Sequence, residues 1–369
     1  MTLLQSPPDL SPAPAEPEEL PARIRPRSWS GVDLIEGFGA IVSSFCLTWL
    51  VYEELTPLSG GLGFAVCWYA AFLLTYWLMI RQRYGRIVAK DRLASSVIWG
   101  LGIILVGSLV LIVVYTAIEG YHALRLTFFI HDQFGVNPRQ KATAGGGLAA
   151  IVGTVEQVGL ASLISVPLGL FTAVFLSEIR GRWARPVRLL TDAMSGIPSI
   201  LAGLFIYATL IESHWLPESG FAVALALAIS MLPTMTRTSE VVFRLVPGGL
   251  REASLALGST EWRMVRRVLV PTAITGLITA MILGVARIVG ETAPAIIDAG
   301  GSPKVNYNPF KGQQDSLPLM IYTDIRSFVP NEHLRAWTAG LVLLAMILVL
   351  FVLARNPVPF RRRLPKGLP

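Results

Sequence analysis

The chain has 369 residues, of which 53% are hydrophobic and only 15% charged, and its mean hydropathy is +0.58. Ordinary soluble proteins carry about 25% charged residues, so this chain lacks the polar side chains needed to cover a water-facing surface. The composition excludes, as main interpretations, a chain disordered over its whole length and a nucleic-acid-binding arm. The net charge is +7, and the placement of the charges matters more than this total. The two cysteines, Cys46 and Cys67, lie inside apolar runs, which excludes a disulfide framework and a cysteine metal cluster.

The two ends of the chain differ from the rest. Residues 1–33 are rich in proline and glutamate and predict a disordered tail. Residues 356–369 form a second tail, which is basic.

Between the tails lie eight apolar runs, each long enough to approach the roughly 20 residues that a membrane-spanning helix needs. This pattern predicts an all-α integral membrane protein with about eight transmembrane helices. We place the spans near 34–52, 61–80, 93–118, 150–178, 187–211, 220–236, 272–299 and 337–354. The sixth is short and is expected to end at Pro233.

Lysine and arginine are dense in every second loop. They gather before the first span, in the loops 81–92, 180–188 and 237–267, and after the last span, and they are sparse elsewhere. Because basic residues favour the cytoplasmic side, both termini and the loop 237–271 are expected in the cytoplasm, with 301–335 outside. With a wrong number of spans the basic loops would not alternate between the two sides, so the alternation supports the predicted number.

The cytoplasmic loop carries the most specific motif. Within residues 251–271, Glu252 and Ala253 suit a short helix, and Gly258 is able to adopt the positive φ that ends one. Ser259 or Thr260 is suited to cap a second helix.

The second helix would present an aromatic side chain, Trp262, and we expect Pro271 to end the pattern before the next span. The result is a helix–turn–helix elbow between two spans. The alternative is an amphipathic helix lying on the membrane, with Arg263, Arg266 and Arg267 among lipid headgroups.

The order Glu252-Ala253-Ser254, then Gly258, then Pro271 resembles the EAA loop of type I ABC importer permeases, although Ser254 replaces the second alanine of that motif. In that family the loop forms coupling helices that dock into a groove of a cytoplasmic ATPase. The resemblance therefore implies an ATPase-coupling role for Glu252, Ala253, Gly258 and Trp262.

Further segments are similar to the phosphate importer permease of the PstA type, namely Ser-Gly-Ile-Pro-Ser-Ile at 195–200, Leu-Pro at 232–233 with Arg237 and Glu240, and Arg-Ile-Val-Gly-Glu-Thr-Ala-Pro at 287–294. The resemblance covers about 93–355, a six-span type I permease core. Residues 34–92, an N-terminal transmembrane hairpin and its basic loop, have no counterpart in that core.

The resemblance also implies the partners of the chain in a phosphate import complex in the cell (inner) membrane. These are a second permease subunit of the PstC type, two cytoplasmic ATPase subunits of the PstB type and an extracytoplasmic phosphate-binding protein of the PstS type. ATP would bind to the ATPase, so no cofactor is expected in this chain.

The residues themselves indicate no catalytic machinery. The sequence has no G-x-x-x-x-G-K-[ST] phosphate loop. The four histidines fall in loops without metal-ligand spacing, and no nucleophile and base are paired. We therefore expect a transport subunit with no catalytic or metal site, and no nucleic-acid partner.

Arg287 and Glu291 are charged residues within the seventh apolar run, four apart and so expected on one helical face. One interpretation is a structural pair between helices. The other places Arg287 on the translocation pathway, where its planar guanidinium suits phosphate oxygens, with Glu291 holding it.

Two alternative functions stay open at this point. One is a permease for another oxyanion, such as molybdate or sulfate. The other is a helical membrane scaffold without transport, which would have no need of an ATPase-docking elbow.

Overall fold

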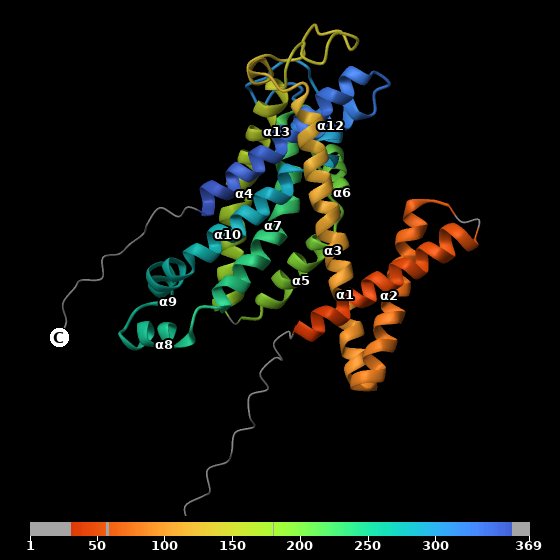
Figure 1. Cartoon of the computed structure of the whole chain (residues 1–369). Helices are drawn as coiled ribbons and strands as arrows, with labels where there is room; N and C mark the ends of the chain where they lie inside the picture. The colour runs from red at the N-terminus through yellow and green to blue at the C-terminus, as the bar shows by residue number, and fades with distance from the viewer. Residues whose placement is uncertain (1–30, 57–58, 180, 356–369) are drawn as a thin grey trace, which may run out of the picture. The chain divides into compact units, whose positions relative to one another are not determined.

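The computed structural model describes residues 31–56, 59–179 and 181–355, and within them helices form all regular structure apart from one isolated bridge between Gly300 and Gln314 (Figure 1). The tail predicted for 1–33 lies outside the described residues except for its last three, which open the first helix, and the basic tail 356–369 lies outside them altogether. The chain divides into two compact units at Leu109 and Val110.

The first unit contains α1 (Gly31–Trp49) with a π-helical turn (Leu50–Leu55), α2 (Gly61–Tyr84) and the first part of α3 (Arg86–Tyr121). Ala40, Tyr76 and Ile80 pack together in its small core. Glu36, only 3% exposed, forms an ion pair of 2.7 Å with Arg83 and accepts a hydrogen bond of 3.1 Å from the Tyr84 hydroxyl. A buried carboxylate needs such partners.

The second unit is built around α4 (Leu148–Glu178) and α7 (Gly220–Arg244), with α10 (Val270–Val289) packed against α7 (Figure 1). Small residues bring α4 and α7 close, as is common between membrane helices. A Cβ added at Gly169 would lie 2.8 Å from Met235 Cγ, and Ser165 Oγ donates to Ala228 O at 3.1 Å.

The second unit also contains a 3₁₀ turn (Leu126–Phe129), the short helices α11 (Ala293–Asp298) and α12 (Leu317–Ile325), and the long α13 (Pro330–Arg355). α12 packs against α13. A buried network ties the segment before α12 to α4: Gln157 Nε2 donates to Gln314 Oε1 at 3.2 Å, and Gln314 Nε2 donates to Glu156 Oε2 at 2.6 Å.

Within the described residues, seven helices are long and apolar enough to cross a membrane, and an eighth span exists only if a bent pair is counted as one. The fifth span, predicted near 187–211, is a bent pair of helices. α5 (Ala184–Ser195) and α6 (Ser199–Ile206), which continues into a π-helical turn (Tyr207–Ile211), meet at 102°. Pro198 explains the break, because proline disfavours helical backbone at the residue before it.

Two other prolines, Pro233 and Pro271, do not interrupt the helices in which they lie. α7 continues past Pro233 to Arg244, so the sixth span does not end where expected. Pro271 lies at the start of α10, and the helical span runs from Glu261 to Val289 without stopping there. A π-helical turn (Val265–Leu269) directly precedes it. A π-helical turn shifts the backbone hydrogen bonds by one residue. This shift accommodates Pro271, which has no N–H to donate.

Candidate coupling loop and charged cluster

The elbow predicted in the cytoplasmic loop is present. α8 (Gly248–Ala256) is followed by Leu257 and then by Gly258, whose φ of +77° terminates the helix. The Gly258 N–H donates to Leu255 O at 2.9 Å and the Ser259 N–H donates to Ser254 O at 3.2 Å. These two bonds form a Schellman motif, which requires a left-handed residue at the glycine position.

A second short helix, α9 (Glu261–Met264), follows at once, and Thr260 is its cap, with Oγ1 accepting from the Arg263 N–H at 3.4 Å. The sequence had indicated either Ser259 or Thr260 as the cap, and the structure shows that it is Thr260. Met264 and Val265 are buried against Phe243 at the end of α7, which anchors the elbow to the helix bundle.

The four residues predicted to face the ATPase lie on the surface of the elbow. Glu252, Ala253 and Gly258 are exposed, and Trp262 is 59% exposed. Leu257 is also exposed, at 88%, and was not predicted. An exposed tryptophan and leucine on a short, well-capped loop form an apolar surface suited to a protein partner.

Arg251 faces the other way and holds α8 against the bundle. Its guanidinium donates to Phe243 O at 2.6 Å and to Val246 O at 3.2 Å, and it forms an ion pair of 3.3 Å with Glu178 at the end of α4. The elbow is thus connected to the ends of both central helices through one side chain.

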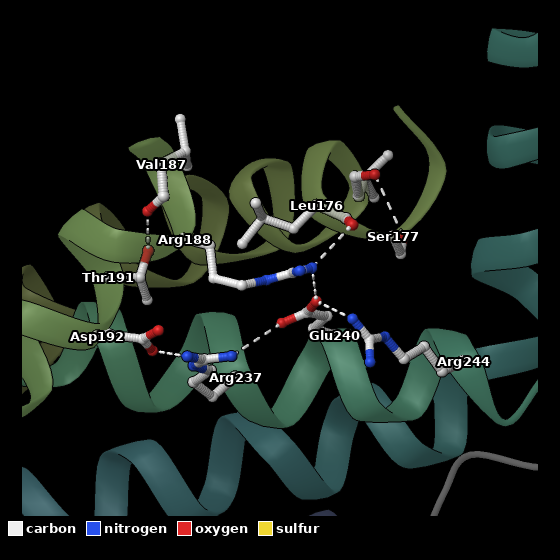
Figure 2. Close-up of polar contacts among 10 residues, drawn as sticks. Leu176, Ser177, Val187, Arg188, Thr191, Asp192, Arg237, Glu240 and Arg244 are labelled. Atoms are coloured by element: carbon white, nitrogen blue, oxygen red, sulfur yellow. Dashed lines mark hydrogen bonds and ion pairs between the residues drawn. The ribbon is translucent and has the colours of Figure 1, made fainter. Parts of the chain in front are cut away.

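Close by, a charged cluster gathers around Glu240, which is 3% exposed on α7. Arg188 and Arg244 both donate to its Oε1, at 2.7 and 2.6 Å, and Arg237 lies 3.5 Å from its Oε2 while also pairing with Asp192 (Figure 2). Three guanidinium groups compensate for the burial of this carboxylate.

Sequence reasoning noted Arg237 and Glu240 only as part of a resemblance and did not predict the cluster. The spacing of Arg237, Glu240 and Arg244 on one helix was an available signal, because residues three and four apart are neighbours. Arg188 comes from a different helix, 52 positions before Glu240, and no sequence periodicity indicates that contact.

The predicted pairing of Arg287 with Glu291 was wrong. α10 ends at Val289, and Glu291 lies in the break before α11, so the two residues do not share a helical face. Arg287 Nη1 instead donates to Thr234 Oγ1 on α7 at 2.7 Å. Arg287 is exposed and Glu291 is half-buried.

Two carboxyl groups have perturbed acidity, that of Asp315 just before α12 and that of Asp324 within it. Burial raises the pKa of Asp315 to about 7, opposed by a hydrogen bond from the Ser316 N–H and reinforced by Asp324. Burial likewise raises the pKa of Asp324 to about 6. Among the described residues, no group of three or more His, Cys, Asp or Glu side chains is placed to hold a metal ion.

Comparisons with known proteins identify the family of the chain. Residues 165–363 match the family described as binding-protein-dependent transport system inner membrane component. The phosphate transport system permease protein PstA 1 of Mycobacterium tuberculosis H37Rv is 41% identical over 252 residues, which cover 67% of this chain and 81% of that protein. The PstA permease of Mycobacterium leprae is 36% identical over 70% of this chain and 85% of that protein. An inward-facing structure of the MetNI methionine ABC transporter is 22% identical, with a TM-score of 0.45 over 55% of this chain and 91% of the matched chain.

The chain is therefore a membrane permease of the binding-protein-dependent transport family. Within that family it belongs with the PstA permeases of phosphate transport systems.

Proposed function

We propose that this chain is the permease subunit of an ATP-driven phosphate importer and forms half of its translocation pathway. The observation that carries the proposal is the identity of 41% with a phosphate transport system permease, extending over 81% of that protein. The alternative of a molybdate or sulfate permease has no comparable support.

The elbow of α8 and α9 is proposed as the docking surface for the ATPase, with Glu252, Ala253, Gly258 and Trp262 in contact with it. Exposure of these residues and the anchoring of the elbow by Arg251 support this role. A force applied to the elbow would pass to the ends of α4 and α7 through that anchor.

Arg287 is proposed as a phosphate contact on the pathway. A guanidinium has five N–H donors, and only Nη1 has a hydrogen-bond partner among the described residues. Its remaining donors and its exposure suit an oxyanion that has lost part of its hydration. Glu291, half-buried beyond the end of the same helix, is proposed as a second polar group along the pathway.

The remaining assembly follows from the family. A second permease chain would complete the pathway, two ATPase subunits would bind and hydrolyse ATP, and an extracytoplasmic binding protein would deliver phosphate. We place the complex in the inner membrane with both termini in the cytoplasm, as the distribution of basic residues favours.

Uptake of radiolabelled phosphate into cells or vesicles that contain the whole complex tests the proposal. Arg287→Lys should lower uptake because an ammonium lacks the planar fork, and Arg287→Ala should lower it further, with the amount of assembled complex unchanged. Glu291→Gln should have a milder effect. Unlabelled phosphate should compete, whereas molybdate and sulfate should not. Uptake that persists when the chain is deleted would contradict a transport role.

A further inference from the structure

A basic cavity of about 450 Å³ lies where the ends of α4 and α7 approach the starts of α5 and α8. Three arginines from three different helices line it, together with Ser177 and three apolar side chains, Leu176, Ile179 and Ala184. The arginines are Arg188, Arg244 and Arg251. Its volume falls within the range of small-molecule sites in proteins, roughly 300–1,000 Å³.

Two of these arginines, Arg188 and Arg244, keep a terminal nitrogen free for a ligand. Arg188 and Arg244 both use Nη2 to reach the same oxygen of Glu240, as Figure 2 shows. Within the described part of the chain, neither Nη1 has a hydrogen-bond partner, and the two side chains are 40% and 60% exposed. One carboxylate oxygen therefore serves two guanidinium groups whose side chains remain partly exposed.

The charges around the cavity do not balance. Each carboxylate of the group forms an ion pair with at least one of the arginines, yet one guanidinium remains in excess. The arginines are Arg188, Arg237, Arg244 and Arg251, and the carboxylates are Glu178, Asp192 and Glu240. Neighbouring like charges in a partly buried place favour the uptake of a counter-ion.

We propose that this cavity binds a phosphate group, either of an anionic lipid headgroup or of free inorganic phosphate on the cytoplasmic side. Guanidinium groups recognise phosphate oxygens with paired N–H donors. Basic pockets between helices at the cytoplasmic end of membrane proteins suit phospholipid headgroups.

This site is separate from the pathway residue Arg287. Arg287 is bonded to Thr234, and Arg244 lies ten positions further along α7, which corresponds to about 15 Å of helix. Because Arg251 belongs to α8, a bound phosphate group would link the elbow to the helix bundle and restrain its movement.

The lipid source is tested with the purified full chain in detergent, titrated with phosphatidylglycerol or with uncharged phosphatidylcholine and examined by native mass spectrometry. One phosphatidylglycerol should bind in preference, and Arg244→Gln should weaken it about tenfold, the effect of losing one hydrogen bond to a charged group. Arg185→Gln, an exposed arginine of α5 outside the cavity, is the matched control and should bind as the unaltered chain does.

The free-phosphate source is tested by binding of radiolabelled inorganic phosphate to the Arg287→Ala chain, which removes the proposed pathway contact. Saturable binding that Arg244→Gln weakens about tenfold identifies free phosphate as the ligand. Ser177→Asp is a second variant that keeps every arginine and places a carboxylate in the cavity, so it should also weaken binding. If Arg244→Gln and Ser177→Asp match Arg185→Gln in both experiments, the site does not exist.

Discussion

The glycine that ends α8 offers a clean test of how the elbow is built. At Gly258 an added Cβ would meet no atom within 4 Å, yet φ is +77°. The main cost of a substitution there is therefore backbone strain. For an L-residue in the left-handed region that strain is about 1–2 kcal/mol, with valine at the upper end.

The strain should reach the elbow as a whole because its local stability is low. α8 contributes no buried residue to the core, and segments with little buried surface open easily. A penalty of about 1–2 kcal/mol lowers the population of the folded elbow by at most about 5- to 30-fold. Binding of the proposed ATPase partner should weaken by up to the same factor, if Trp262 contacts it as proposed, since only the folded elbow holds Trp262 in place.

The measurement compares Gly258→Val with Gly249→Val in the assembled complex. Gly249 is also exposed and free of contacts within 4 Å, but its φ is not positive, so the same side chain adds no strain there. Gly258→Val should reduce co-purification of the ATPase or uncouple hydrolysis from transport, Gly258→Asn should do so less, and Gly249→Val should do neither. Equal effects of the two valine substitutions would refute the role of the left-handed turn.

Further predictions concern packing, acidity and topology. Gly153→Ala should lower the free energy of unfolding of the detergent-purified chain by about 1–3 kcal/mol, because the new Cβ would overlap the backbone oxygen of Asp315. Gly159→Ala, in the same helix with nothing within 4 Å, should instead raise it by up to about 1 kcal/mol. Because the folded pKa of Asp315 is raised from 3.8 to about 7, its protonated form stabilises the fold below about pH 4, and that contribution is lost as pH rises through about 7. Hydrogen exchange of residues 311–326, corrected for the intrinsic rate, should speed up over that interval, and Asp315→Asn should remove most of the change. A reporter at Asn308 should be accessible from outside and one at the C-terminus from the cytoplasm; the reverse would overturn the charge-based topology.

The sequence was informative wherever one chemical requirement dominates. Long apolar runs have to be helices in a membrane, and seven helices of the described residues meet that requirement at or near the predicted places. The elbow was equally predictable, because Gly258 and Thr260 have conformational preferences that act within a few residues.

The sequence was misleading where the environment decides between allowed outcomes. Pro198 breaks a helix, whereas Pro233 lies inside one and Pro271 near the start of another. The difference depends on whether neighbouring groups compensate for the missing N–H, which local sequence does not reveal. The spacing of Arg287 and Glu291 similarly predicted that the two side chains pair on one helical face. The helix ends between them, and Arg287 donates a hydrogen bond to Thr234 of α7 instead.

Arg287 also bears on why one copy of this chain forms only part of a pathway. It is exposed near the end of an apolar span, and its hydrogen bond to Thr234 satisfies only one of its nitrogens. A charged side chain on a membrane span costs free energy unless it is paired or faces water, and polar groups without partners in hydrocarbon add to that cost. The stable location for this face of α10 is therefore against water or another polar protein surface, and not against lipid. The second permease chain that we propose as a partner, with a hydrated path between the two, would supply that environment.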